Sequence, residues 1–276
     1  MRVRYLFASM TVLSCALMGG VEAGAAAARK NVSPALVAPE HEDGAFCKFY
    51  RVTNPKIVVL MIDRTLPVTN ASDREDAKEA MTQALLMTEM GQRLRIITIR
   101  EDIGSSKKLF DDCRPGRPKG IASLFEAPEN PEDLKVDEPA FNNAVKAAVD
   151  AAVDERNRLQ QSPQSAIINT IASVGRQFQG RLAGLVLSSD MIEGRLADLT
   201  PKPDAGLDVR TRNGLLEKAA ELGQIPRLDG VMVKSFTVNL WDRKNRPVLS
   251  DATAKDLRDF WIDYFRMAGV SSVTIN

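Results

Sequence analysis

Residues 57 to 62 read Ile-Val-Val-Leu-Met-Ile, and the polar stretch Asp63-Arg64-Thr65-Leu66-Pro67 follows directly. An unbroken apolar run with β-branched residues is typical of a strand buried on both faces of a parallel sheet. Residues 94 to 99 and 182 to 187 are further segments of strand length that are rich in apolar residues. Because parallel strands need long crossover connections, these runs predict helices between them.

Amphipathic segments do lie between the predicted strands. Residues 73 to 90 carry apolar side chains at helical spacing and end at Gly91, and residues 140 to 160 form a second helical face. Ser162 and Pro163 predict the cap and first turn of a third helix. The later pattern predicts a helix at 213–222, a strand at 231–240, a helix at 252–267 and a strand at 272–275. We therefore expect an α/β fold with a doubly wound, mostly parallel sheet and helices on both faces.

Residues 104 to 139 interrupt this alternation. They are rich in Gly, Pro and charged side chains and show little periodicity beyond residues 120 to 125. The sequence therefore predicts no regular element for most of this segment.

The N-terminus has the features of a secretory signal peptide. Arg2 and Arg4 precede an apolar run from Tyr5 to Gly20, and small residues lead to a cleavage site after Ala23. The run of about 16 apolar residues is shorter than the roughly 20 needed to span a bilayer. We expect an exported, periplasmic protein with signal peptide 1–23, flexible tether 24–45 and one domain over 46–276. The alternatives are an uncleaved membrane anchor and lipidation at Cys15.

The charge balance excludes one class of partner. Loss of Arg2, Arg4 and Glu22 with the signal peptide leaves 35 basic and 35 acidic residues, so there is no positive surplus for nucleic acid.

The sequence also lacks the G-x-S-x-G and Walker A motifs, and its one histidine, His41, falls in the predicted tether among acidic residues. We therefore expect a protein that is not an enzyme.

Two cysteines remain after signal cleavage, Cys47 and Cys113. An exported protein matures in an oxidising compartment, where such a pair usually bonds. The predicted disulfide closes a loop between residues 66 positions apart and would stabilise the fold by about 4 kcal/mol. The alternative, two buried free thiols, requires a cytosolic protein.

Oxygen-bearing side chains follow two of the predicted strands. Asp63 and Thr65 come after the first strand, and Asp190 follows Ser188 and Ser189 after the strand at 182–187. Ligands of doubly wound sheets bind outside the carboxyl ends of the strands. Carboxylates and hydroxyls without His or Cys are ligands typical of a hard cation such as Mg²⁺ or Mn²⁺. With Ser162 in the turn before a helix, they form a candidate metal site of Asp63, Thr65, Ser162 and Asp190.

In these motifs the chain resembles the von Willebrand factor type A-like domains, and most closely their small exported bacterial members. That family has a doubly wound α/β fold and often a metal-ion-dependent adhesion site, with D-x-S-x-S after the first strand, a loop Thr and a later Asp. Asp63 and Thr65 match the first two motif positions, Ser162 resembles the loop Thr and Asp190 the final Asp. Pro67 replaces the second motif hydroxyl, for which Thr69 or Ser189 could substitute.

The resemblance implies a protein-binding module of adhesion or scaffold type, in which a carboxylate of a protein partner completes the coordination of the metal ion. Local structure offers another interpretation, because Asp63 can cap a turn and Ser162 a helix. The site would then be a hydrogen-bonded vestige. The chain would in that case be a metal-free structural or assembly component of an envelope complex. A metal-dependent hydrolase is the remaining alternative.

Overall fold

The computed structural model describes residues 44–65, 71–118, 130–156, 165–194, 207–237 and 250–275. By its contacts the chain divides into Met1–Ser33 and Pro34–Asn276, and all described residues belong to the second unit. The predicted signal peptide, nearly all of the predicted tether, Cys15, His41, Pro67 and Ser162 lie outside the described residues. No helix within the described ranges is long and apolar enough to cross a membrane.

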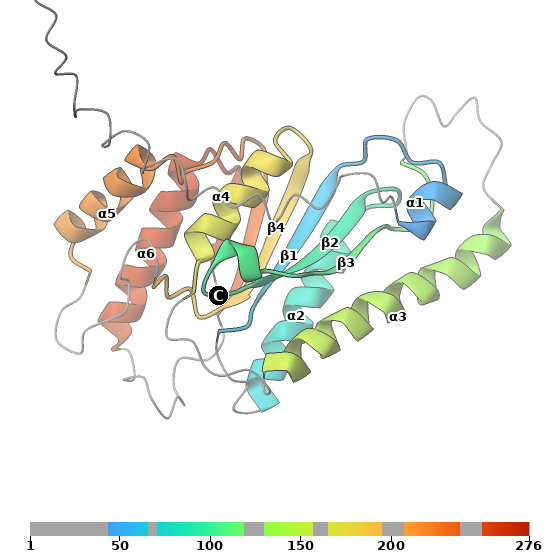
Figure 1. Cartoon of the computed structure of the whole chain (residues 1–276), viewed down its shortest axis with the longest axis horizontal. Helices are drawn as coiled ribbons and strands as arrows, with labels where there is room; N and C mark the ends of the chain where they lie inside the picture. The colour runs from blue at the N-terminus through green and yellow to red at the C-terminus, as the bar shows by residue number, and fades with distance from the viewer. Residues whose placement is uncertain are drawn as a thin grey trace, which may run out of the picture. The chain divides into compact units, whose positions relative to one another are not determined.

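A six-stranded, mostly parallel sheet forms the centre of the fold (Figure 1). Its order is β3-β2-β1-β4-β5-β6, and only β3 runs antiparallel to its neighbour. The strands are β1 (Ile57–Asp63), β2 (Arg93–Ile99), β3 (Lys108–Cys113), β4 (Leu182–Ser189), β5 (Met232–Thr237) and β6 (Ser272–Ile275). The chain passes from β1 outward to β2 and β3, then crosses to the other side of β1 for β4. The predicted doubly wound sheet is confirmed, with its switch point between β1 and β4.

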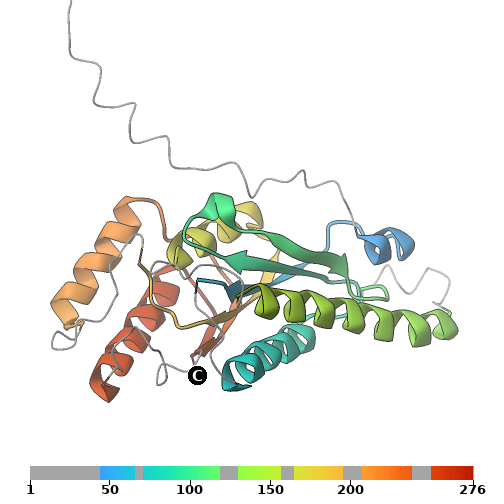
Figure 2. The same ribbon diagram turned by 60° about the horizontal axis from the view of Figure 1, so that its bottom comes forward.

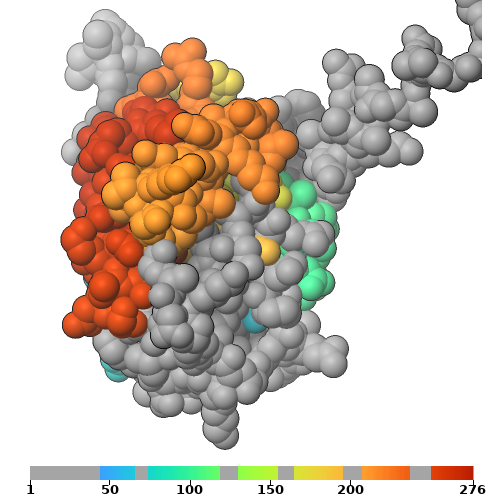
Figure 3. Space-filling model, turned by 90° about the vertical axis from the view of Figure 1, so that its left-hand side faces the viewer, coloured from blue at the N-terminus to red at the C-terminus, as the bar shows by residue number. Residues whose placement is uncertain are grey.

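Helices cover both faces of this sheet (Figure 2). Helices α2 (Ala71–Met87) and α3 (Pro131–Arg156) pack on one face, and α4 (Ile167–Gln177) and α6 (Asp251–Met267) on the other. Helix α5 (Val209–Glu221) lies beside α6, where Arg212 pairs with Asp259 at 3.2 Å and with Asp263 at 3.6 Å. Figure 3 shows α5 and α6 as neighbouring parts of the surface.

Strand β1 explains why the fold needs helices on both faces. All seven of its residues are buried. Ile57, Val59 and Met61 belong to the core beneath α4 and α6, whereas Val58 and Leu60 belong to the core beneath α2 and α3. Because successive side chains of a strand point to opposite faces, an unbroken apolar run fills two cores at once.

Residues 104 to 139, for which the sequence predicts almost no regular structure, contain a strand and the beginning of a helix. Strand β3 occupies Lys108–Cys113, and α3 begins at Pro131 rather than at residue 140. Strand β3 escaped prediction because it is a polar edge strand whose Asp111 pairs with Arg93 and Arg95, at 2.6 Å in each case. The early turns of α3 carry charged side chains in place of an apolar stripe.

A short helix before the sheet, α1 (Ala45–Phe49), is fixed to β3. The predicted disulfide between Cys47 and Cys113 is confirmed and buried. Asp112 accepts hydrogen bonds from the backbone N–H groups of Cys47 at 3.0 Å and Phe46 at 3.2 Å. A Cβ atom at Gly44 would lie 2.1 Å from the Asp112 carboxylate, so this close approach requires glycine.

Candidate functional site

Asp63, the last residue of β1, is the centre of a buried polar cluster at the carboxyl edge of the sheet. Its side chain is completely buried, and its carboxylate accepts four hydrogen bonds. Oδ1 accepts from the backbone N–H of Thr65 at 2.9 Å and from the Thr65 hydroxyl at 2.7 Å. Oδ2 accepts from Ser189 at 2.7 Å and from Ser165 at 3.0 Å. Three hydroxyls from three separate segments thus converge on one carboxylate.

Ser165 supplies a hydroxyl from the segment before α4, whereas the predicted ligand Ser162 lies outside the described residues. Ser165 forms an isolated bridge with Glu193, and the N-cap of α4 is Ala166. The prediction that this helix begins at Ser162 and Pro163 is therefore wrong. The bridge holds Ser165 in extended backbone, because Gly194 N–H donates to Ser165 O at 3.2 Å and Ala166 N–H donates to Arg100 O at 2.9 Å.

The hydroxyls of Thr65 and Ser165 make more contacts than they have protons to donate. Their oxygens are in hydrogen-bond contact with each other, and each also contacts a different oxygen of Asp63. A hydroxyl carries a single proton, so two hydroxyls cannot donate to all three contacts at once. Without a further donor or cation, one of the three contacts places two oxygen lone pairs opposite each other.

Ser189 reaches the site because β4 runs parallel to β1. Ile62 pairs with Ser188 across the two strands, so Ser189 lies beside the end of β1. Since side chains alternate between the faces of a strand, Ser188 and Ser189 point to opposite sides, and only Ser189 bonds to Asp63. Asp190 follows the strand, is fully buried, and accepts from the backbone N–H of Ile192 at 3.0 Å.

The turn after Asp190 contains a strained residue. Met191 has a φ of 59°, in the left-handed region that non-glycine residues occupy at a cost of about 1–2 kcal/mol. Its N–H donates to Ser189 Oγ at 3.0 Å, and its carbonyl accepts from the Trp261 indole at 2.7 Å. Strain of this kind concentrates at functional sites, where the surrounding contacts maintain it.

A further carboxylate, that of Glu193, lies next to the cluster. It is fully buried and accepts from the backbone N–H of Ile168 at 2.7 Å, in the first turn of α4. The positive end of the helix dipole favours a carboxylate in this position. Burial raises the pKa of the Tyr264 hydroxyl, and the negative charge of Glu193 raises it further. Tyr264 is therefore a neutral donor, and its hydroxyl bonds to Gln224 O at 2.7 Å.

The donor set suits a hard cation. Asp63 supplies carboxylate oxygens, and Thr65, Ser165 and Ser189 supply hydroxyl oxygens. Mg²⁺ prefers both kinds of ligand. The carboxylate of Asp190 belongs to the residue that follows Ser189, and it accepts a hydrogen bond from Ile192. No cluster of three or more His, Cys, Asp or Glu side chains with metal-ligand geometry occurs among the described residues. A cation at this edge would therefore depend on the hydroxyl oxygens.

Comparison of the sequence with protein-family models gives no match, and comparison with the curated proteins gives none either.

Proposed function

We propose that this chain is an exported protein-binding module of adhesion or scaffold type, which holds a divalent cation at the carboxyl edge of its sheet. The observation that carries the proposal is the convergence of Asp63, Thr65 and Ser165, in which two hydroxyls have too few protons for their three contacts. A cation between these oxygens would remove the lone-pair conflict. It would also offset the repulsion between the two buried carboxylates of Asp63 and Asp190.

Five side chains would hold the ion: Asp63, Thr65, Ser165, Ser189 and Asp190. Ser189 would stand in for the motif hydroxyl replaced by Pro67, and its hydrogen bond to Asp63 supports this role. The bound ion would supply a coordination position for a carboxylate of a partner protein, as the resemblance to von Willebrand factor type A-like domains implies. The chain's own residues fix the ligands in place and exclude water from them.

The metal proposal is tested by thermal unfolding of the disulfide-bonded protein with Mg²⁺ or Mn²⁺. A ligand that binds only the folded state stabilises it by mass action, so the Tm should rise and then saturate, over a range extended to about 10 mM ion. Asp190→Ala should abolish the rise. Asp150→Ala, at a half-exposed position on α3 that pairs with Lys146, should retain it. An equal rise in both variants, or none in the unchanged protein, would contradict the proposal.

Export is supported by the buried disulfide, because such bonds persist in oxidising compartments. A fusion of residues 1–30 to a reporter that is active only in the periplasm should be active, and the mature N-terminus should lie near Gly24. An intact Met1 on the purified native protein would contradict cleavage. Recovery of a lipid on Cys15 would instead support the membrane-anchored alternative.

A second candidate function is that of a metal-free assembly component of an envelope complex. The favouring observation is that the Asp63 carboxylate already accepts four hydrogen bonds and is fully buried. This candidate predicts no metal-dependent rise in Tm and unchanged partner binding by the Asp63→Ala and Asp190→Ala variants. A metal-dependent hydrolase would be recognised by product turnover in place of stoichiometric binding.

A further inference from the structure

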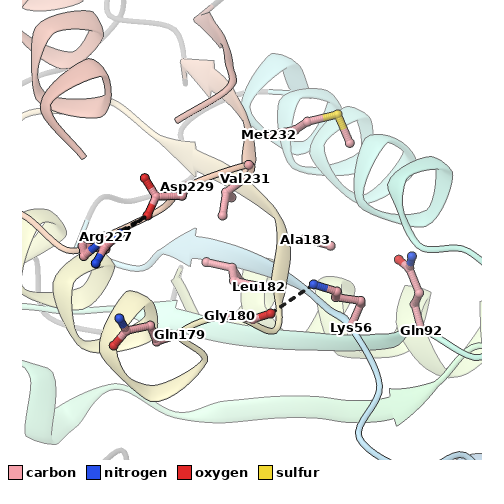
Figure 4. Close-up of a pocket in the computed structure, with 11 residues that line it drawn as sticks. Lys56, Gln92, Gln179, Gly180, Leu182, Ala183, Arg227, Asp229, Val231 and Met232 are labelled. Carbon is pink, nitrogen blue, oxygen red and sulfur yellow. Dashed lines mark hydrogen bonds and ion pairs between the residues drawn. The ribbon is translucent and has the colours of Figure 1, made fainter. Parts of the chain in front are cut away.

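A pocket of about 550 Å³ opens at the amino ends of the strands, away from the Asp63 cluster (Figure 4). We call it the amino-edge pocket. It lies where β1, β2, β4 and β5 begin, whereas Asp63 lies where β1 ends. Its lining residues include Lys56, Gly180, Ala183, Arg227, Gly230 and Met232. The proposed metal site uses none of them.

An irregularity in the sheet forms part of the pocket wall. Ile57 pairs with Leu182, but the next residue, Val58, pairs with Gly184, so Ala183 is an extra residue in β4. Such bulges are rare between parallel strands and are over-represented near functional sites. Here the extra residue lines the pocket.

Two glycines with positive φ line the pocket. Gly180 precedes β4 with a φ of +76°, and Gly230 precedes β5 with a φ of +77°. No atom lies within 4 Å of the position that a Cβ would take at either glycine. Backbone conformation, not crowding, therefore favours glycine here, and the space that a side chain would fill stays open.

The pocket has an apolar side that solvent reaches. Leu182, Ala183, Val231 and Met232 line it. Leu182 and Val231 are buried, and Met232 is 45% exposed, so solvent reaches this side chiefly at Met232. Met232 pairs in register with Gly184, over which Met87 packs. A flexible methionine at a pocket rim adapts to apolar ligands of different shape, and a ligand that covers it gains hydrophobic free energy.

The polar groups at the rim carry a positive surplus. Lys56 donates to Gly180 O at 3.0 Å, which engages one of the three ammonium protons. Arg227 pairs with Asp229 at 3.0 Å, so the only carboxylate among the lining residues is already neutralised by a cation. In Figure 4 Lys56 and Arg227 stand on different sides of the apolar wall. One net positive charge beside an apolar surface suits a ligand with one negative charge and an apolar body.

We propose that the amino-edge pocket binds a small amphipathic carboxylic acid, with its carboxylate at Lys56 and its hydrocarbon part against Ala183, Val231 and Met232. The binding is independent of the proposed metal site, because the two lie at opposite ends of the same strands. The affinity is on the order of millimolar, because the cations are solvent-exposed and the ligand is small.

The test is an NMR titration of the full, disulfide-bonded protein with sodium hexanoate. The amide signals of residues 180, 183, 230 and 231 should shift and saturate. Hexylamine and 1-hexanol have the same chain length without the negative charge and should bind more weakly. No saturable shift at these amides by about 50 mM hexanoate, well above a millimolar Kd, would overturn the proposal. Equal binding of the amine or the alcohol would also overturn it.

Two variants test the assigned contact. Lys56→Gln should weaken hexanoate binding by roughly fivefold, as expected for loss of one exposed charge contact. Lys146→Gln, an exposed lysine on α3, is the matched control and should leave the affinity unchanged. If Lys56→Gln binds as tightly as the control while thermal unfolding shows both folded, the assignment is wrong.

Discussion

The charged side chains at the two ends of β1 differ in burial. At the carboxyl end, Asp63 is fully buried and four hydrogen bonds compensate its carboxylate. At the amino end, Lys56 immediately precedes the strand, is exposed at a pocket rim, and donates to a single backbone carbonyl among the described residues. A buried charge needs partners supplied by the fold, whereas an exposed charge is solvated by water. The hydrogen-bond donors around Asp63 must therefore be placed precisely by the fold, whereas Lys56 needs no such set of partners.

Different bonds hold these two edges together. The amino edge is fixed by the Cys47–Cys113 disulfide and by Arg114, which donates to Thr88 O at 2.7 Å and pairs with Glu138 at 2.6 Å. At the carboxyl edge, hydrogen bonds join Asp63 to Thr65, Ser165 and Ser189. Removal of the disulfide should therefore leave the carboxyl edge intact, and changes at Asp63 should leave the disulfide intact.

The largest effect is expected from loss of the disulfide. The Cys47→Ser, Cys113→Ser double variant should lower the free energy of unfolding by about 4 kcal/mol, because the unfolded chain gains the entropy of an open loop. Urea unfolding measures the change. If the two edges are independent, the variant should keep any metal-dependent rise in Tm. A loss below about 1 kcal/mol would show that the bond contributes little to stability.

Asp63→Ala should have the next largest effect, at about 3 kcal/mol of unfolding free energy. It removes the acceptor of three buried hydroxyls, and unsatisfied buried polar groups are costly. Asp150→Ala, at a half-exposed ion pair, should change stability by less than about 1 kcal/mol. Equal losses in chemical denaturation of the two variants would contradict the central role of Asp63.

Adjacent serines at the end of β4 allow a closer comparison. Ser189 donates to Asp63 and accepts from Met191, whereas the buried Ser188 hydroxyl has no hydrogen-bond partner among the described residues. Ser189→Ala should cost about 1–2 kcal/mol, and Ser188→Ala should be neutral or slightly stabilising. Urea unfolding of the two variants side by side tests this. The reverse order would show that Ser189 does not support the cluster.

The smallest effect is expected from a change at the exposed Lys56. Lys56→Gln should change the free energy of unfolding by less than about 0.5 kcal/mol, because its contact with Gly180 O is exposed. The same unfolding assay measures it. A loss comparable to that of Asp63→Ala would mean that the exposed contact of Lys56 contributes to stability as much as the buried contacts of Asp63, which would contradict the comparison.

The central strands were predictable because burial on both faces leaves a continuous apolar run. Asp63 and Thr65, which the structure joins by hydrogen bonds, were predictable for a related reason, since the residues that follow such runs lie at one edge of the sheet. Asp190 as a ligand stays a prediction. The two elements in the unpredicted segment, β3 and the start of α3, lack this pattern. Edge strand β3 is held by ion pairs of Asp111 with two arginines of β2, which hydrophobic periodicity does not reveal.

Ser165 shows why the candidate site was only partly predictable. Ser162 and Pro163 form a favourable helix start in the sequence, but the helix begins at Ile167. The bridge between Ser165 and Glu193 joins residues that are far apart in the chain, and local propensity carries no information about it. The one available signal was position, because Ser165 is the last hydroxyl before the apolar residues that open α4. The sequence contains no pattern that indicates the amino-edge pocket, because part of its wall depends on a one-residue shift in the pairing of β1 with β4.

Diffraction from crystals grown with Mn²⁺, with data collected near the manganese absorption edge, tests the central claim most directly. The proposal predicts one anomalous peak at the carboxyl edge, within coordination distance of Asp63, Ser165 and Asp190, and no peak in crystals of Asp190→Ala. A cluster that keeps all four hydrogen bonds to Asp63, with no anomalous peak beside it in saturating Mn²⁺, would contradict the metal site and favour the metal-free assembly component.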